Sequence, residues 1–327
     1  MNDEAAITLK NEPPARSQAR RSVEVRVPAS TSNLGAGFDC FGLALQLYLT
    51  VRATIRHGSQ EPCRIRASRG ESRALLPRTA DNLIYRAMRH AAEREGVTVP
   101  PVRLAIHNEI PLGRGLGSSA AAVIAGITLC SLLSRQEIPR ERVLRYAREL
   151  EGHPDNVAAS LYGGWVITCE KEDGNVLAIK RRWPAEIKIV AVSPNMPVKT
   201  ARARAALPRT VKREDAVHNI QRTALFIAAM ERGLYDLLWE AMRDRLHQER
   251  RQSLVPGLME ALAIPRLPGL VGLALSGAGP SILALAQNSF DEIGERIGRC
   301  FHQHGIETTV RLLDVDHVGA TAEERKN

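Results

Sequence analysis

The stretch PLGRGLGSSAA, residues 111–121, is the most informative segment of the sequence. It follows a strand-like segment and leads into an alanine-rich helical segment. Its glycines allow positive φ and close approach of the backbone to a ligand; they are Gly113, Gly115 and Gly117. The first turn of the following helix has unpaired amides, and the helix dipole adds positive potential there. Such a turn binds phosphate oxygens. The hydroxyls of Ser118 and Ser119 can donate to phosphate or bind Mg²⁺.

Two other phosphate motifs fit this loop less well. A Walker A loop needs a lysine after its last glycine, whereas Ser118 follows Gly117. The spacing from Gly115 to Ala120 matches a dinucleotide-binding fingerprint, but that motif belongs in an early βαβ unit. A helix start whose glycines serve only a turn and close packing is the remaining alternative.

The hydrophobic patterns on either side predict a mixture of strands and helices. We expect strands at 23–27, 43–55, 63–67, 102–106, 164–169, 176–180, 187–192, 270–275, 281–286 and 307–313. We expect helices at about 83–95 (capped by Asp81 and ended by Gly96), 118–133, 139–150, 214–231, 234–250 and 290–303. Because the order shows no regular βαβα alternation, the pattern favours an α+β fold.

A new series of predicted strands and helices begins near 182–186, which predicts two domains, 22–184 and 185–318. Residues 1–21 are polar and predict a disordered extension, and 319–327 predict a tail. The run from Leu116 to Ser134 is too weakly apolar to cross a membrane, and no secretory apolar region precedes the fold. Five dispersed cysteines without a Cys-x-x-Cys pair indicate free thiols and a cytoplasmic protein.

The charge of the chain is basic, with 45 Lys and Arg against 36 Asp and Glu. Nucleic-acid binding is one explanation of such a balance. The basic residues are nevertheless interspersed with acids, aromatic residues make up only 4%, and no DNA-binding motif occurs. An anionic small substrate explains the charge equally well, so we expect no nucleic-acid partner and no membrane partner.

Three glycine-containing segments in this order resemble the GHMP kinase superfamily: 28–42, 111–121 and 275–285. The resemblance implies a two-domain fold, with an N-terminal domain like domain 2 of ribosomal protein S5 and a ferredoxin-like C-terminal domain. It also implies that ATP binds at the glycine loop, with the third segment packed beneath it and Asn82 near the nucleotide base. The implied nucleotide residues are Asn82, Pro111, Leu112, Gly113, Arg114, Gly115, Leu116, Gly117, Ser118, Ser119, Ala120, Ala121, Gly277 and Gly279.

Within that superfamily the chain is similar to the homoserine kinase family. The similar segments are Asn33 to Asp39, Glu151 to Val157, Lys199 to Arg204 and Leu246 to Arg251. The last one departs from the family pattern, because Glu249 and Arg250 replace a Pro-Tyr pair. The resemblance implies ATP-dependent phosphorylation of the side-chain hydroxyl of L-homoserine, a step of threonine biosynthesis.

The resemblance also implies roles for single residues around this small zwitterion. Arg204 and Arg251 would hold its carboxylate through charge-assisted bonds. Asn33 and Asp39 would receive its ammonium group and hydroxyl, and Thr200 belongs to the same substrate set. His153 would bond the substrate or order its loop.

For the metal we expect the carboxylate of Glu151 together with a hydroxyl of Ser118 or Ser119, since Mg²⁺ prefers oxygen ligands. Phosphoryl transfer depends mainly on positioning and charge neutralisation. Catalytic candidates are Asp39, Asp155 and Asn156, but no general base is assigned, and Asp155 could instead brace its loop.

Two alternatives stay open at this point. One is another GHMP small-molecule kinase, acting on mevalonate or a sugar. The other is a basic nucleic-acid-binding or regulatory protein on a kinase-like scaffold. The sequence does not give the oligomeric state, and a homodimer is compatible with it. We also expect that Gly117→Val would block ATP use while leaving folding largely intact.

Overall fold

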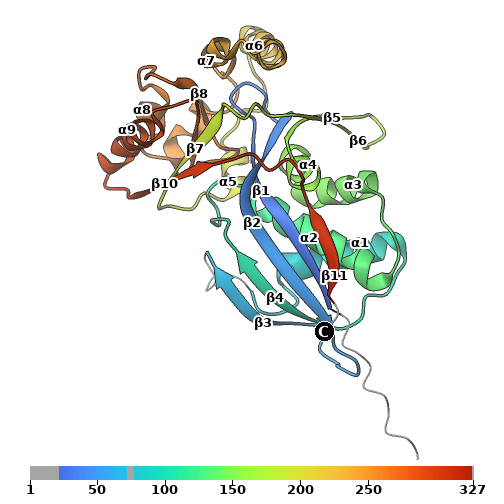
Figure 1. Cartoon of the computed structure of the whole chain (residues 1–327). Coiled ribbons are helices and arrows are strands. Elements are labelled where there is room, and N and C mark those ends of the chain that lie inside the picture. The colour runs from blue at the N-terminus through green and yellow to red at the C-terminus, as the bar shows by residue number, and fades with distance from the viewer. Residues whose placement is uncertain (1–21, 72–76, 326–327) are drawn as a thin grey trace, which may run out of the picture.

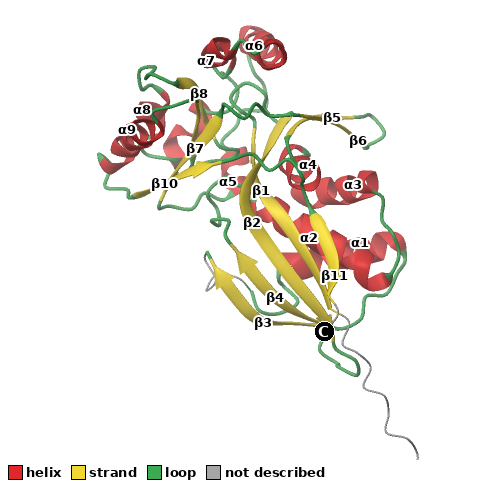
Figure 2. Cartoon of the chain, viewed as in Figure 1, coloured by secondary structure: helices red, strands yellow, loops and turns green. Residues whose placement is uncertain are grey.

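A computed structural model describes residues 22–71 and 77–325 (Figure 1). The predicted extension, residues 1–21, lies outside the described residues, and so do 326 and 327 of the predicted tail. Strands and helices are mixed in both halves (Figure 2), and the α+β prediction is confirmed. Among the described residues, no helix is long and apolar enough to span a membrane.

The first sheet is built mainly from the first half of the chain. Its strands are β1 (Ser22–Ser32), β2 (Phe41–Ile55), β3 (Cys63–Gly70), β4 (Val102–Asn108), β5 (Trp165–Glu170), β6 (Val176–Arg181) and β11 (Thr321–Arg325). The order is β11-β1-β2-β4-β3, with β5 paired to β2 and β6 to β5. Only the β3–β4 pair among the described strands is parallel. The alternation in β1 buries the apolar residues Val23, Val25 and Val27 completely.

Four helices gather on one side of this sheet (Figure 1). They are α1 (Leu83–Glu95), α2 (Ser118–Ser134), α3 (Arg140–Glu151) and α4 (Asp155–Tyr162). The central helix α2 carries no charged residue, and most of its side chains are buried. A Cβ on its Gly126 would lie 2.2 Å from the carbonyl oxygen of Ile84, so this glycine allows close contact between α1 and α2. The close packing of α2 against α1 therefore fixes the position of α2 and of its first turn.

The second sheet has four antiparallel strands in the order β10-β7-β9-β8. They are β7 (Lys188–Pro194), β8 (Leu270–Leu275), β9 (Ile282–Ala286) and β10 (Thr308–Leu313). The helices of this half are α5 (Thr200–Ala205), α6 (Arg213–Arg232), α7 (Leu238–Ala241), α8 (Leu258–Leu262) and α9 (Phe290–His302). The amphipathic helix α9 buries Ile293, Ile297 and Phe301 against this sheet.

Three local expectations from the sequence are wrong. Asn82, and not Asp81, caps α1, because its Oδ1 accepts a hydrogen bond of 3.0 Å from the amide of Ile84. The helix expected at 234–250 shrinks to a 3-10 turn and the short α7. Beyond α7, the carboxylate of Asp244 accepts backbone amides of Leu246, His247 and Gln248, and the chain turns instead of continuing as a helix.

The third wrong expectation concerns the tail. Residues 321–325 form β11, which pairs antiparallel with β1 from Arg26↔Thr321 to Ser22↔Arg325. All five residues of β11 are exposed and mostly polar, so they carry no alternation that would predict a strand. β6 ends at Arg181 and β7 begins at Lys188, on the two sides of the predicted domain boundary.

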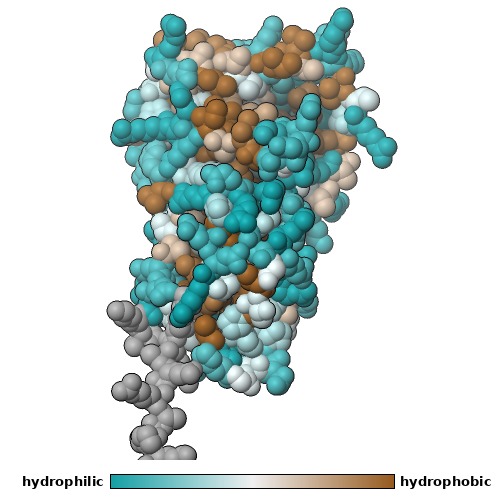
Figure 3. All heavy atoms as spheres, turned by 90° about the vertical axis from the view of Figure 1, so that its right-hand side faces the viewer, coloured by the Kyte–Doolittle hydropathy of each residue, from teal (hydrophilic) through white to brown (hydrophobic). Residues whose placement is uncertain are grey.

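The surface is mainly hydrophilic in its middle, and apolar residues gather toward the top of the view in Figure 3. Exposed apolar side chains include Leu177 and Ile179 on β6 and Val217 and Ile220 on α6. The edge strand β6 and the helix α6 are joined by an ion pair between Arg181 and Glu231.

Candidate active site

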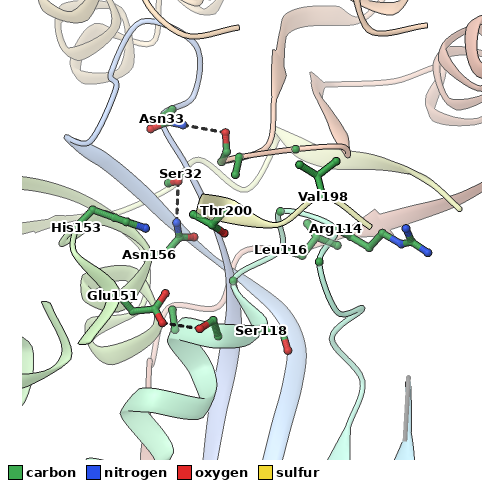
Figure 4. A pocket seen from close by; sticks show the side chains of 18 of the residues that line it. Ser32, Asn33, Arg114, Leu116, Ser118, Glu151, His153, Asn156, Val198 and Thr200 are labelled. Carbon is green, nitrogen blue, oxygen red and sulfur yellow. Dashed lines mark hydrogen bonds between the residues drawn. The ribbon is translucent and has the colours of Figure 1, made fainter. Parts of the chain in front are cut away.

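A cavity of about 340 Å³ lies where the two halves of the chain meet. Its walls come from the loop after β1, the glycine loop before α2, the turn between α3 and α4, the segment ending in α5, and the turn after β8 (Figure 4). Segments far apart in the sequence therefore converge on one pocket.

The glycine loop of residues 111–117 forms one wall of the pocket and ends in the first turn of α2. Gly113, Gly115 and Gly117 have φ values of 65°, 77° and 72°, which favour glycine. Gly117 is the N-cap of α2, and no side chain of the described residues caps the helix. The first turn, Ser118 to Ala120, lines the cavity, so the positive end of the helix dipole faces it. This is the geometry of an anion-binding helix start.

Packing behind the loop also requires these glycines. A Cβ on Gly115 would lie 2.2 Å from the carbonyl oxygen of Ser276, and one on Gly117 would lie 2.1 Å from Oγ of Ser30. The expectation that Gly117→Val leaves folding intact is therefore wrong, because the side chain would collide with β1. The same glycine serves the fold and the ligand surface.

The turn after β8 packs directly under the glycine loop. The hydroxyl of Ser276 donates a hydrogen bond of 2.6 Å to the carbonyl oxygen of Gly115 and lies 2.9 Å from the hydroxyl of Thr31. The amide of Ser281 donates to the carbonyl oxygen of Arg114. The loop is thus held from below by β1 and by the second sheet.

A carboxylate and a hydroxyl meet at the start of α2. Oγ of Ser119 lies 2.5 Å from Oε1 of Glu151, the last residue of α3, and the dashed line at Glu151 in Figure 4 marks this bond. Ser118, Ser119 and Glu151 all line the cavity. Oxygen atoms of this kind are the ligands that Mg²⁺ prefers, so this group fits the ion.

On the other side of the pocket, Asp39 and Arg204 form a bidentate ion pair. Nη2 of Arg204 lies 2.7 Å from Oδ1 of Asp39, and Nη1 lies 3.1 Å from Oδ2. About a third of each side chain is exposed, and both residues line the cavity, so a ligand there can reach both charges.

A second guanidinium, that of Arg251, stands beside this pair and is almost fully buried, with 2% of the residue exposed. It donates a hydrogen bond of 2.8 Å to the carbonyl oxygen of Gly277. Burial and the charge of Arg204 lower the pKa of Arg251 to about 10, so it stays charged at neutral pH. The ring of Phe38 lies with its centroid 5.9 Å from each of the two guanidinium carbons.

His153, Asp155 and Asn156 form a hydrogen-bonded chain at the start of α4. Nδ1 of His153 lies 2.6 Å from Oδ1 of Asp155. Burial alone would lower the pKa of His153, but the hydrogen bond and charge of Asp155 raise it overall. Burial likewise would raise the pKa of Asp155, but His153 and the amide of Asn156 lower it overall. Each of the two buried groups therefore favours the charged form of the other, and His153 points into the pocket (Figure 4).

Asn156 extends this chain to β1. Its Nδ2 donates to Oγ of Ser32 over 2.8 Å, and its Oδ1 accepts from Ser30 over 3.0 Å. Because Oδ1 of Asp155 already accepts from His153 and from the amide of Asn156, the structure favours a bracing role for Asp155 over that of a general base.

Models of two protein families match this chain: the GHMP kinases N terminal domain over residues 82–164 and the GHMP kinases C terminal domain over residues 226–303. The homoserine kinase of Solibacter usitatus is 43% identical over 281 residues, which cover 86% of this chain and 90% of the relative. The homoserine kinase of Desulfitobacterium hafniense is 38% identical over 299 residues, covering 91% and 99%. This chain belongs to the homoserine kinase family.

Solved structures agree with this membership of the homoserine kinase family. The homoserine kinase from Cytophaga hutchinsonii has a TM-score of 0.79 at 26% identity and covers 97% of this chain and 100% of its own. The galactokinase of Lactococcus lactis, solved with galactose, has a TM-score of 0.64 at 16% identity, over 91% of this chain and 95% of its own. The latter shows only that the fold is shared.

Most of the site residues that the homoserine kinase resemblance implied line the cavity, but three do not: Asn82, Leu112 and Ala121. Asn82 is 2% exposed, and its amide is used by the cap of α1 and by a bond to the carbonyl oxygen of Pro77. The structure therefore shows a capping role for Asn82, and the implied contact with the nucleotide base stays a prediction.

Two implied residues lie at the pocket with their polar groups bonded within the protein. Asn33 donates to the carbonyl oxygen of Gly277 over 3.1 Å and accepts from the amide of Asp39 over 3.1 Å (Figure 4). Arg114 donates from Nη2 to Asn195 over 2.9 Å, while its Nη1 is buried without a partner in the described part of the chain.

Sequence reasoning missed several residues that line the cavity: Ser32, Phe38, Pro197, Val198, Lys199 and Ala278. Phe38 could have been found, because it stands beside Asp39 in the first glycine-containing segment. The departure from the homoserine kinase pattern at Glu249 and Arg250 falls in a 3-10 turn, Glu249–Leu254. Arg251 reaches the pocket from that turn nonetheless.

Proposed function

We propose that this chain transfers the γ-phosphoryl group of ATP to the side-chain hydroxyl of L-homoserine, giving O-phospho-L-homoserine and ADP. The observation that carries the proposal is one pocket with two chemically different ends. One end is the glycine loop and the start of α2, which suit phosphate, and the other holds Asp39, Arg204 and Arg251. A zwitterionic amino acid with a hydroxyl tail fits between them.

The ion pair of Asp39 and Arg204 suits such a zwitterion. A bound amino acid would exchange this one pair for two, with its ammonium group on Asp39 and its carboxylate on Arg204 and Arg251. A ligand with only one of the two charges would leave Asp39 or Arg204 without a partner, which is costly for partly buried charges. The pair therefore selects for ligands that carry both charges.

Catalysis in this pocket would rest on positioning. The homoserine hydroxyl attacks the γ-phosphorus in line, the bond to the β-phosphate oxygen breaks, and the hydroxyl proton leaves to solvent or phosphate. Asp39 and the two arginines fix the substrate, while the loop and the first turn of α2 neutralise phosphate charge. Asp155, ionised and already hydrogen-bonded, holds His153 and Asn156 in place.

Ser118, Ser119 and Glu151 are the residues that we propose for Mg²⁺. The short contact between Ser119 and Glu151 brings two oxygen ligands together at the mouth of the phosphate cradle. The ion would supply charge neutralisation to the phosphate oxygens when bound.

We also propose a cytoplasmic location, which the cysteines support. All five are free thiols, and burial raises the pKa of Cys63 and Cys130 to about 11, which keeps them protonated and unreactive.

The experiment measures ADP release from ATP with L-homoserine, mevalonate and galactose in separate reactions. We expect turnover with homoserine and little with the other two; no turnover with homoserine would end the proposal. Two truncated alcohols test the charge requirement: 4-hydroxybutyrate lacks the ammonium group, and 3-aminopropan-1-ol lacks the carboxylate. Both should be poor substrates.

A matched pair of variants on α5 tests the carboxylate assignment. Arg204→Ala removes a charge-assisted contact worth about 1.5–3 kcal/mol, so the KM for homoserine should rise roughly tenfold to a hundredfold. The KM for ATP should change little. Arg202→Ala removes an exposed arginine of the same helix and should leave both constants unchanged. Equal effects of the two variants would contradict the assignment.

A further inference from the structure

His247 lies outside the cavity lining, directly behind Arg251, and is fully buried, with 0% of the residue exposed. Its Nε2 lies 2.8 Å from the carbonyl oxygen of Gly35, and its Nδ1 lies 3.0 Å from Nη1 of Arg251. A carbonyl oxygen only accepts and a guanidinium only donates. The imidazole must therefore carry its proton on Nε2 and present a lone pair on Nδ1.

These two bonds join two segments of the amino-acid site. Gly35 belongs to the loop that carries Asp39, and Arg251 stands beside the Asp39–Arg204 pair on the 3-10 turn Glu249–Leu254. The imidazole also stacks on the ring of Phe38, with centroids 5.0 Å apart and an interplanar angle of 23°. One side chain thus contacts the loop of the acidic residue and the buried guanidinium.

The surrounding backbone fixes the ring. The carboxylate of Asp244 accepts the amides of His247 and Gln248 over 2.9 and 2.8 Å. Oε1 of Gln248 in turn accepts the amide of Leu275, at the end of β8, over 2.6 Å. The turn that carries His247 is therefore tied to the second sheet.

The charged groups around the ring leave it neutral. Burial lowers the pKa of His247, and Arg251 lowers it further. Asp244, with its Oδ2 3.7 Å from Nε2, and the more distant Asp39 act in the opposite direction but do not outweigh burial. A neutral imidazole is the form that can accept a hydrogen bond from Arg251.

We propose that His247 is a positioning residue for the substrate carboxylate: its Nδ1 lone pair aims the guanidinium of Arg251 into the pocket, and the bond from its Nε2–H to Gly35 fixes the tautomer that leaves this lone pair free. The inference rests on the proposed function in that the carboxylate belongs to homoserine. Without the Nδ1 acceptor, the bonds that Arg251 keeps within the described part of the chain are those to the carbonyl oxygens of Gly277 and Ala203.

Two substitutions separate the two ring nitrogens. His247→Asn places an amide oxygen near the position of Nδ1 and loses the bond to Gly35. His247→Gln reaches toward Gly35 and leaves Arg251 without its acceptor. His304→Gln, at an exposed histidine paired with Glu260, is the matched control and should leave every constant unchanged.

We expect His247→Gln to raise the KM for homoserine about tenfold or more, because a buried hydrogen bond to a charged group is lost. His247→Asn should stay within about threefold of the wild type, with kcat and the KM for ATP nearly constant in both, as expected for loss of a substrate-binding contact. Equal changes in the two variants, no change in either, or a matching rise in the KM for ATP would overturn the inference.

A second measurement does not depend on turnover. Long-range ¹H–¹⁵N NMR spectra of the wild type should show His247 neutral at pH 7, with the proton on Nε2 and Nδ1 as the acceptor. A proton on Nδ1, or a charged ring, would overturn the inference even if homoserine is a substrate. Absence of homoserine turnover alongside the expected tautomer would instead count against the proposed function alone.

Discussion

Gly117→Ala tests the double use of the glycine loop by the fold and by the ligand. The backbone of Gly117 has a φ of 72°, and a left-handed residue with a Cβ costs about 1–2 kcal/mol. The new Cβ would also lie 2.1 Å from Oγ and 2.7 Å from the carbonyl oxygen of Ser30. Overpacking of this kind costs about 1–3 kcal/mol. The free energy of unfolding should fall by about 2–5 kcal/mol.

Gly58→Ala is the matched control for this prediction. Gly58 has the same φ of 72°, but apart from its two chain neighbours no atom of the described residues lies within 4 Å of where its Cβ would stand. It therefore carries only the backbone cost of about 1–2 kcal/mol. The difference between the two variants isolates the contact between the loop and β1.

Urea denaturation measures the free energy of unfolding of both variants, and steady-state kinetics then measure the KM for ATP of each. Because Gly117 caps α2, relief of the collision with Ser30 must move the loop or β1, and the KM for ATP should rise in Gly117→Ala alone. Equal losses of stability in the two variants would contradict the close contact between the loop and β1, and an unchanged KM for ATP in a destabilised Gly117→Ala would contradict the link between that contact and the nucleotide.

Three further predictions concern single side chains. Glu151→Gln should raise the Mg²⁺ concentration needed for half-maximal activity, because a carboxylate ligand becomes a neutral amide; an unchanged Mg²⁺ titration would contradict the metal assignment. Asp155→Asn should lower the pKa of His153, followed by NMR, because burial then acts without the opposing carboxylate. If instead the pKa of His153 rises in Asp155→Asn, the carboxylate of Asp155 is not what raises it in the wild type. Because the folded-state pKa of His153 is raised, its protonation stabilises the wild-type fold at low pH, and this stabilisation is lost as the pH rises through that pKa. Asn82→Ala should reduce the free energy of unfolding by about 1 kcal/mol through loss of the cap while leaving the KM for ATP unchanged, and a large rise in that KM would instead favour the nucleotide contact.

Much of the fold follows from local patterns in the sequence. The alternation of apolar and polar residues in β1 predicts a half-buried strand, and the uncharged apolar run of α2 predicts a buried helix. β11 is different, since its residues are exposed and its pairing with β1 comes from a segment almost 300 residues away. The prediction of a helix at 234–250 was wrong for a local reason, because the carboxylate of Asp244 accepts the amides of His247 and Gln248, which in a helix would donate to backbone carbonyl oxygens.

Some parts of the candidate site follow from a short stretch of sequence, whereas others depend on contacts that only the structure shows. The glycine loop is contiguous, so its residues and its shape follow from one short segment. The pairing of Asp39 with Arg204 joins residues 165 positions apart, and only the structure shows that they contact each other. His247 gave no signal of its own, because its role depends on which ring nitrogen meets Arg251.

The pairing of β11 with β1 has a consequence for biosynthesis. During translation, the strand that completes the first sheet leaves the ribosome after every strand of the second, so the half of the chain made first waits with an open edge on β1. Exposed strand edges attract other chains. A nascent polypeptide shortened before Thr321 would keep that edge open permanently, and self-association of the shortened product is the expected cost.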